Sequence, residues 1–341
     1  MSVTIKDIAG KLGISYTTVS RALNDRPDIS EATKERVRAV AQSLGYSPND
    51  IARGLVKNNT RTIGVIIQDI ANPYFADIVR GIENYANKKD FTTFLGNSDW
   101  DEGKELKYIQ AFASKRVDGL IINPVTTKSF DIIRNLNLSM PVVFVSALDQ
   151  SESCTCIDID NEMAAKVITE YLIDLKHTDI AFVGGNEAIA DLRDRIRGYS
   201  KIMDENGLTK RIFPFSTPSL TRESGMLLGS ELVRREPFPS AVIAANDFVA
   251  LGLLEAFDDN KIRVPDDVSM VSFDNIDIAA MRKINLTTVE LPRYRMGEIS
   301  AEVLINYIVQ PQDIQPHHIL LNANFIVRGS SRAKKSNEQL T

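Results

Sequence analysis

The fold of the N-terminal part is decided by the stretch Gly13-Ile14-Ser15-Tyr16-Thr17-Thr18-Val19-Ser20-Arg21-Ala22-Leu23-Asn24. Ser15 is a favourable N-cap, and the residues after it follow a helical period. One face of this helix is apolar and consists of Val19, Ala22 and Leu23. The opposite face is polar and consists of Thr17, Ser20, Arg21 and Asn24, with Tyr16 beside it in the first turn. The stretch therefore predicts a short amphipathic helix with a polar surface.

Helices are also predicted on both sides of this stretch. Thr4 precedes an apolar series at positions 5, 8, 9 and 12, and Gly13 can end that helix. A third helix begins after Ser30 and stops at Gly45. Two helices joined by a tight glycine-containing turn form a helix-turn-helix, whose second helix can enter the major groove of DNA. Residues 1–47 are predicted to be an all-α DNA-binding headpiece; a small helical bundle with a solvated polar face is the alternative.

The residue types on the polar face and the charge of the segment both suit DNA. Arg21 can donate two hydrogen bonds to a guanine edge, and Tyr16 and Thr17 offer hydroxyl groups and apolar surface. The first 60 residues carry nine Lys or Arg and six Asp or Glu, a net charge of +3, whereas the whole chain has −5. A basic segment on an acidic body is the balance expected when one end of a protein binds nucleic acid.

The composition of the whole chain is typical of a soluble protein with several domains. It has 341 residues, of which 43% are hydrophobic and 25% charged, and no apolar run approaches the ~18–20 residues that span a bilayer. The N-terminus has no apolar signal region, and Cys154 and Cys156 cannot build a disulfide framework, so we expect a cytoplasmic protein with no membrane partner. Neither these cysteines nor His317 and His318 have the partners of a metal site, and no nucleotide-binding or hydrolase motif occurs. We therefore expect no enzyme activity, no catalytic residue, no metal and no cofactor.

Residues 48–60 are predicted to be a short helix and a polar linker. Pro48 follows Ser47 as a strong helix start, but the candidate helix ends near Val56 and contains Gly54. Isolated helices shorter than ~12–15 residues are marginal in water, and an interior glycine costs about 1 kcal/mol relative to alanine. The segment can therefore fold against a partner, or it can serve as a simple interdomain linker.

The rest of the chain alternates between strands and helices. A continuous, mostly β-branched run predicts a strand at 63–67, and further strands are predicted at 91–96, 119–122, 141–145, 180–183, 241–244 and 268–273, with helical segments between them. This order predicts an α/β fold with helices on both sheet faces, and its length favours two lobes with a cleft at the carboxyl ends of the strands. Asn246 and Asp274 each follow a buried strand, where their side chains suit the hydroxyl groups of a sugar or nucleoside. Both residues can equally be turn or cap residues.

Three strings of the N-terminal part strongly resemble the headpiece of the lactose/galactose repressor (LacI/GalR) family: Thr4–Ala9, Gly13–Asn24 and Leu44–Asn49. The resemblance implies that Tyr16, Thr17 and Arg21 contact base edges. It implies contacts to the DNA backbone, or positions beside it, for four residues: Ser15, Thr18, Ser20 and Asn24.

The same resemblance implies a role for the short helix. Leu55 matches the leucine that this family inserts between base pairs in the minor groove, an insertion that bends the duplex. Ile51 and Ala52 would then pack against the groove floor or the same helix of a second chain. Two half-sites with a central wedge imply a homodimer on a pseudo-palindromic operator.

Residues 61–330 resemble the effector domain of that family, which is like a periplasmic sugar-binding protein. The matching strings are Asp69–Phe75, Val117–Ile122, Ala245–Asp247, Phe273–Asn275 and Leu286–Val289. The resemblance implies a first lobe of about 61–160 and 292–320, and a second of about 161–291 and 321–330. It also implies that Arg195 contacts a small-molecule effector, a carbohydrate or nucleoside; a surface salt bridge is the alternative for this arginine. Tyr74 and Phe75 can offer an aromatic wall to the ligand, or they can be plain core residues.

Some positions depart from the family pattern. Leu291 replaces a polar residue that many members carry before the proline that corresponds to Pro292, and Leu220 stands where some relatives have a stacking aromatic. The sequence therefore leaves the identity of the effector open. The polar tail, 331–341, has no heptad leucines, which favours a dimer over a tetramer.

The implied function is a ligand-controlled transcriptional regulator, a repressor. Two other functions fit the same sequence: a regulator controlled mainly by a partner protein, and a cytoplasmic solute-binding module or sugar-processing enzyme with an inert headpiece.

Overall fold

The computed structural model describes residues 3–46, 60–136, 138, 140–146, 154–215, 220–313 and 315–334. The chain divides into two compact units, Met1–Thr60 and Arg61–Thr341. The residues for which we predict minor-groove contacts, Ile51, Ala52 and Leu55, lie outside the described residues. Within the described ranges, no helix has both the length and the apolar character that crossing a membrane requires.

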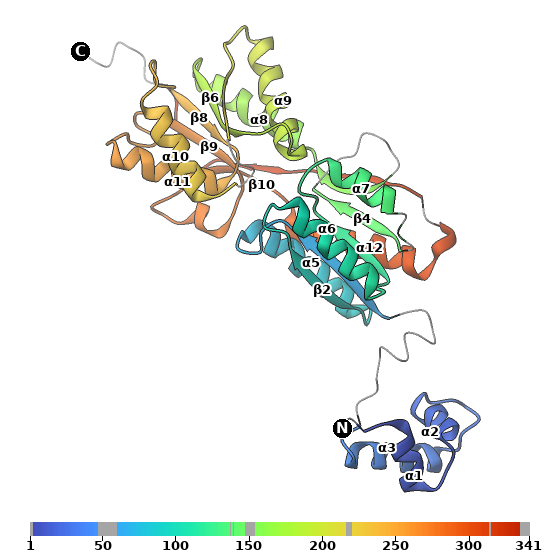
Figure 1. The fold of residues 1–341 in the computed structure, drawn as a ribbon. Coiled ribbons are helices and arrows are strands. Elements are labelled where there is room, and N and C mark those ends of the chain that lie inside the picture. Colours follow the sequence, from blue (N-terminus) through green and yellow to red (C-terminus); the bar gives the residue numbers. More distant parts are fainter. Residues whose placement is uncertain are drawn as a thin grey trace. The chain divides into compact units, whose positions relative to one another are not determined.

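The described part of the first unit, residues 3–46, is a bundle of three helices: α1 (Ile5–Leu12), α2 (Tyr16–Leu23) and α3 (Glu31–Ser43) (Figure 1). The turn between α1 and α2 begins at Gly13, whose φ of 65° is a left-handed conformation that glycine adopts without strain. Ser15 caps α2, because its Oγ accepts a 3.0 Å hydrogen bond from the backbone N–H of Thr18. Buried apolar side chains of all three helices form one small core: Ile8, Ala9, Val19, Ala22, Val37 and Ala41. The predicted helix-turn-helix is confirmed.

The described part of the second unit contains two six-stranded sheets, which confirms the predicted two-lobed α/β architecture. The first sheet has the order β11-β5-β4-β3-β1-β2, with β1 (Thr62–Ile67), β2 (Thr92–Asn97), β3 (Gly119–Ile122), β4 (Val142–Val145), β5 (Thr155–Ile159) and β11 (His318–Leu321). The second has the order β12-β10-β9-β8-β6-β7, with β6 (Ile180–Gly185), β7 (Arg211–Pro214), β8 (Ala241–Ala244), β9 (Ser269–Asp274), β10 (Thr287–Glu290) and β12 (Asn324–Ile326). Neighbouring strands are parallel except for the antiparallel pair β10 and β12.

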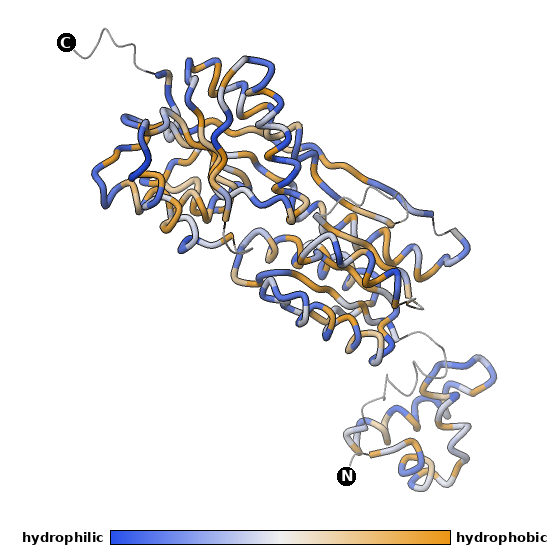
Figure 2. Tube along the Cα trace, turned by 45° about the horizontal axis from the view of Figure 1, so that its top comes forward, coloured by the Kyte–Doolittle hydropathy of each residue, from blue (hydrophilic) through white to orange (hydrophobic). Residues whose placement is uncertain are grey.

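Helices cover both faces of the first sheet (Figure 1). The pair α5 (Pro73–Lys88) and α12 (Arg293–Val309) packs on one face, and α6 (Glu102–Ser114) and α7 (Lys128–Leu136) on the other. Side chains of β1 serve both faces, because Val65 and Ile67 belong to the apolar cluster of α5 whereas Ile66 belongs to that of α6. Figure 2 shows the hydrophobic stretches that follow from this double burial along the strands.

The second sheet is also flanked by two helix pairs. The helices α8 (Asn161–Asp174) and α9 (Ala190–Glu205) pack on each other, and so do α10 (Arg222–Val233) and α11 (Asp247–Asp259). Two short 3₁₀ helices complete the described elements: η1 (Asp277–Ala280) and η2 (Pro311–Asp313).

Two glycines allow α5 and α12 to cross in close contact. A Cβ atom on Gly297 would lie 2.1 Å from the carbonyl oxygen of Ile78, and one on Gly81 would lie 2.2 Å from that of Tyr294. No larger residue fits either position unless the backbones separate, so these glycines set the distance between the two helices.

The chain passes between the two sheets three times. It leaves the first sheet after β5, returns to it from β10 through α12, and leaves it again between β11 and β12. Each sheet therefore receives its last strand from the C-terminal part of the chain.

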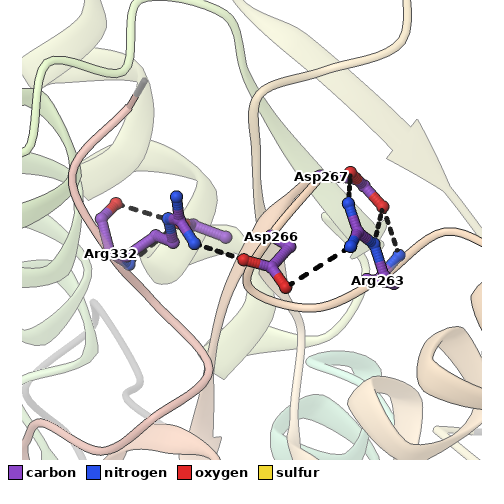
Figure 3. A network of polar contacts seen from close by, with 5 residues as sticks. Arg263, Asp266, Asp267 and Arg332 are labelled. Carbon is purple, nitrogen blue, oxygen red and sulfur yellow. Dashed lines mark hydrogen bonds and ion pairs between the residues drawn. The ribbon is translucent and has the colours of Figure 1, made fainter. Parts of the chain in front are cut away.

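The segment after β12 is tied to the second sheet. The Ser330 hydroxyl donates to the carbonyl oxygen of Met270 and accepts from the backbone N–H of Thr287, both at 2.7 Å. Figure 3 shows the exposed ion pairs at the end of this segment, in which Arg332 pairs with Asp266 and Arg263 pairs with Asp266 and Asp267. Exposed pairs of this kind contribute about 0–1 kcal/mol each, so the buried hydroxyl is the stronger attachment.

The strands β5, β7, β10, β11 and β12 are not among the strands predicted above from apolar segments. In β5 the buried carboxyl of Asp158 interrupts the apolar run, and β10 contains Thr287, Thr288 and Glu290. The strands β7, β11 and β12 lie at sheet edges and consist of exposed and half-buried positions, which weakens the apolar signal.

Candidate functional site

The polar face of α2 is accessible in the headpiece. Tyr16 is 60% exposed, and the side chains of Thr17 and Arg21 are exposed as well. Arg21 forms an exposed ion pair with Asp28, with 2.5 Å between Nη2 and Oδ2. Because both side chains of this pair are exposed to solvent, the ion pair is weak, and the guanidinium can exchange Asp28 for another acceptor.

The predicted backbone-contacting residues have local roles as well. The Ser15 hydroxyl lies 2.6 Å from Oγ1 of Thr17 and 2.8 Å from Oγ1 of Thr18, and it caps the helix. At the other end of α2, Nδ2 of Asn24 donates to the carbonyl oxygen of Ser20 at 2.7 Å. These hydrogen bonds fix both ends of α2, while Ser15 and Asn24 keep exposed side chains.

The second unit contains a cleft where the carboxyl ends of strands from both sheets meet. From the first sheet it is lined by Gln68, Asn72, Tyr74, Phe75, Trp100, Asn123, Pro124, Val125, Thr126, Thr127, Phe130 and Ser146. From the second it is lined by Ile189, Ala190, Asp191, Leu192, Arg195, Leu220, Asn246 and Asp274. All five residues that we predict to contact an effector therefore lie around one cleft. Leu291 does not line it but is buried in the apolar core.

Arg195 is held rigidly in the wall of the cleft. Its side chain is buried, its Nε donates to Oδ1 of Asn161 at 2.8 Å, and its Nη1 donates to the carbonyl oxygen of Ala245 at 2.6 Å. The guanidinium also lies over the ring of Phe273, at 4.2 Å from the centroid. These contacts fix the position of the positive charge.

Asp274 ends β9 in a strained conformation. Its φ of 106° is unusual for a residue with a side chain, and its carbonyl oxygen accepts a hydrogen bond from Arg293. Burial raises the pKa of Asp274 to about 7, although Arg195 acts in the opposite direction.

Asn246 caps a helix and also lines the cleft. Its Oδ1 caps α11 by accepting a 2.9 Å hydrogen bond from the backbone N–H of Val249. Asp247, the next residue, accepts from Ser272 and Thr288, and burial raises its pKa to about 6. The cap alternative for Asn246 is thus present in the structure, and the residue also lines the cleft.

The aromatic wall contains a third ring that the sequence did not indicate. Phe75 meets Tyr74 edge to face at 5.0 Å and meets Trp100 at 6.2 Å between ring centroids. Trp100 follows β2 and is far from the other two in sequence, so only the sheet order brings it to them.

Asp191 is a cleft residue that the sequence reasoning missed. Its Oδ2 accepts a 2.6 Å hydrogen bond from the Ser146 hydroxyl, which itself lies 2.7 Å from the Tyr74 hydroxyl. Burial raises the pKa of Asp191 to about 6, although Arg195 again acts in the opposite direction. Its position one turn before Arg195 on α9 is the signal that could have identified it.

The chain matches two family profiles that together cover most of its length. The profile described as bacterial regulatory proteins, lacI family, matches residues 4–49. The profile described as periplasmic binding proteins and sugar binding domain of LacI family matches residues 60–328.

Individual relatives agree with these profiles. Catabolite control protein A of Priestia megaterium is 33% identical over 90% of this chain and 93% of its own. The HTH-type transcriptional repressor PurR of Photobacterium profundum is 30% identical over 96% of this chain and 98% of its own. A solved structure of the Lac repressor dimer bound to operator and the anti-inducer ONPF has a TM-score of 0.85 and 26% identity, covering 98% of this chain and all of that one.

Proposed function

Because the chain belongs to the lacI family of bacterial regulatory proteins, we propose that it represses transcription at a specific operator under the control of a small molecule. The observation that carries the proposal is the exposed polar face of α2 within the matched headpiece. Tyr16, Thr17 and Arg21 contact base edges, and four residues contact or flank the DNA backbone: Ser15, Thr18, Ser20 and Asn24. In this function the chain has no catalytic residue.

The proposed operator complex is a homodimer on a pseudo-palindromic site. Residues 48–60 form the hinge, in which Leu55 enters the minor groove and Ile51 and Ala52 pack beside it. The solved Lac repressor relative is a dimer bound to operator, which supports this arrangement.

The proposed effector site is the cleft between the two sheets, lined by Tyr74, Phe75, Arg195, Asn246 and Asp274. Amide, carboxylate and guanidinium groups beside an aromatic wall suit a carbohydrate or nucleoside. The first lobe comprises about 61–160 and 292–320, and the second about 161–291 and 321–330. A ligand that binds one arrangement of the lobes more tightly shifts the population toward it and thereby changes operator affinity.

The test begins with selection of DNA from a random pool by the full chain. We expect an enriched site with two inverted half-sites, bound far more tightly than unselected DNA at the same salt concentration. An Arg21→Ala variant taken through the same selection should lose the preference at one position of each half-site. Enrichment of no common sequence by the parent protein would refute the proposed function.

A further inference from the structure

Three buried polar atoms of the cleft have no hydrogen-bond partner within the described residues. They are Oδ1 of Asp191, Oδ1 of Asn123 and Nε1 of Trp100. Asn123 is only 4% exposed, and its amide nitrogen already donates to the carbonyl oxygen of Val145 at 2.9 Å. The unpaired atom is therefore the amide oxygen, which requires a donor. Buried polar atoms are costly to leave unpaired, so these atoms indicate the groups that a ligand must supply.

The charges around the cleft are unbalanced. Among the described lining residues, Asp191 and Asp274 are acidic and Arg195 is the one base. The guanidinium of Arg195 is already engaged by Asn161, Ala245 and the ring of Phe273.

Two arginines outside the lining also act on these carboxylates: Arg193 on Asp191 and Arg293 on Asp274. Each of them is paired with another aspartate, Arg193 with Asp194 and Arg293 with Asp77. Among the lining residues alone, a ligand meets one more negative than positive charge, in surroundings where burial strengthens electrostatic interactions.

We propose that the effector is a hydroxyl-bearing cation, such as an amino sugar, whose protonated amine binds the carboxylates of Asp191 and Asp274. The proposal rests on the proposed function, because it names the ligand class of the same cleft. An ammonium group supplies three donors and one positive charge, which matches the two carboxylates and the excess of acceptors. A phosphate or carboxylate at this place would be repelled by both aspartates.

The remaining lining groups fit the rest of such a ligand. Tyr74, Phe75 and Trp100 present aromatic surface, which attracts a cation and packs against the apolar face of a sugar ring. The indole Nε1 of Trp100 is a donor and therefore requires an acceptor, which a hydroxyl oxygen provides.

Asp191 is the residue that distinguishes this cation from a neutral sugar. Its Oδ2 is held by Ser146, which comes from the other sheet and is itself bonded to Tyr74. This arrangement orients the carboxylate and leaves Oδ1 for the ligand. Burial holds the pKa values of Asp191 and Asp274 at about 6 and about 7, so a bound cation also relieves the cost of ionising them.

The experiment is calorimetric titration of the full chain at pH 7.5 with four matched probes: glucosamine, glucose, N-acetylglucosamine and glucose 6-phosphate, and then the corresponding galactose series. In at least one series we expect the free amine to bind at least about 10-fold more tightly than the neutral and N-acetylated sugars, a difference of about 1.4 kcal/mol. The phosphate should bind most weakly. In Asp191→Asn the preference for the amine over the neutral sugar should fall to about one.

Asp194→Asn is the matched control. Asp194 lies one turn further along α9, pairs with Arg197 and does not line the cleft, so its neutralisation should leave the preference unchanged. A loss of preference in Asp194→Asn as large as in Asp191→Asn would show a general charge effect and would overturn the assignment of Asp191.

The proposal is also overturned if a neutral or phosphorylated probe binds as tightly as the amine, or if no amine binds. Measuring operator affinity in the presence of each probe distinguishes failure of the cationic-effector proposal from failure of the proposed function. A neutral sugar that binds as tightly as the amine and changes operator affinity contradicts the proposal of a cationic effector but supports the proposed regulatory function. An amine that binds preferentially but does not change operator affinity supports the proposal of a cationic ligand and argues against control of DNA binding from the cleft.

Discussion

The hydroxyl of Ser146 donates a 2.6 Å hydrogen bond to Oδ2 of Asp191, and this bond joins the two sheets of the larger unit across the cleft. Ser146 follows β4 of the first sheet, whereas Asp191 lies in the first turn of α9 beside the second. A ligand that enters the cleft must bind next to this bond, so its contacts bear directly on how the two sheets are held together.

Arg21→Ala should relax base preference at one position of each half-site, at a cost of about 1–3 kcal/mol there. The reason is the exposed position of Arg21 on α2, where its present partner is the exposed Asp28. The measurement is binding to the selected operator and to its single-base variants. Arg36→Ala, which removes an exposed arginine from α3, should leave the base preferences as they are. If Arg21→Ala shows the parental preference profile, Arg21 does not contact a base.

Leu55→Ala should leave non-specific, salt-dependent binding nearly intact but reduce operator bending and specific affinity. In the proposed complex, phosphate contacts of the basic headpiece provide the non-specific binding, and the apolar side chain of Leu55 provides the bending and the specific affinity. Fluorescence energy transfer between the ends of an operator duplex measures the bend, and binding to unrelated DNA is the control. Equal bending by variant and parent would remove Leu55 from the mechanism.

Asp274→Asn should stabilise the larger unit increasingly as the pH rises. Burial raises the pKa of Asp274 from 3.8 to about 7, so the native state binds a proton that the unfolded chain releases. Its contribution to stability is therefore present at low pH and is lost as the pH rises through about 7. The advantage of the variant should grow by about 2–3 kcal/mol between pH 5 and pH 8.

Urea unfolding at both pH values measures this change. Asn also tolerates the positive φ of position 274, so the substitution adds little backbone strain. Asp277→Asn, at an exposed position on η1, is the control and should follow the parental pH dependence. An advantage of Asp274→Asn that is the same at both pH values would contradict the raised pKa.

Gly297→Ala should destabilise the larger unit by about 1–3 kcal/mol or more, because the new Cβ would lie 2.1 Å from the carbonyl oxygen of Ile78. Thermal unfolding followed by calorimetry resolves the effect. Gly10→Ala in α1 is the contrast: its Cβ meets nothing within 4 Å, so the headpiece should gain about 0.5–1 kcal/mol from better helix propensity. A stable Gly297→Ala variant would show that α5 and α12 can separate without cost.

The sequence predicts those parts of the molecule whose signals are local. The caps at Thr4, Ser15 and Gly13 and the apolar period of three helices suffice for the headpiece, and double burial makes the central strands continuous apolar runs. Asp274 and Asn246 could be placed in a cleft because residues after parallel strands meet at one sheet edge.

The other cleft residues depend on distant parts of the chain. Trp100 follows β2, Ser146 follows β4 and Asp191 lies in the first turn of α9. These residues meet only because the strand order of each sheet and the packing of the two sheets bring those elements together. The spacing of Asp191 one turn before Arg195 can place it on the same face of the helix, but it does not show that the carboxylate is buried or that Ser146 is its partner. Such contacts become visible only when the tertiary structure is known.

The order in which the strands are added has a consequence for synthesis on the ribosome. The headpiece emerges before the larger unit, whereas β11 and β12 complete the edges of both sheets from residues 318–326. A nascent or truncated chain that stops before His318 has a finished headpiece, but β5 and β10 are left as open sheet edges. Exposed edges of this kind pair with other chains and aggregate. We therefore expect a chain that stops before β11 and β12 to aggregate more readily than the full chain, even though its headpiece is complete.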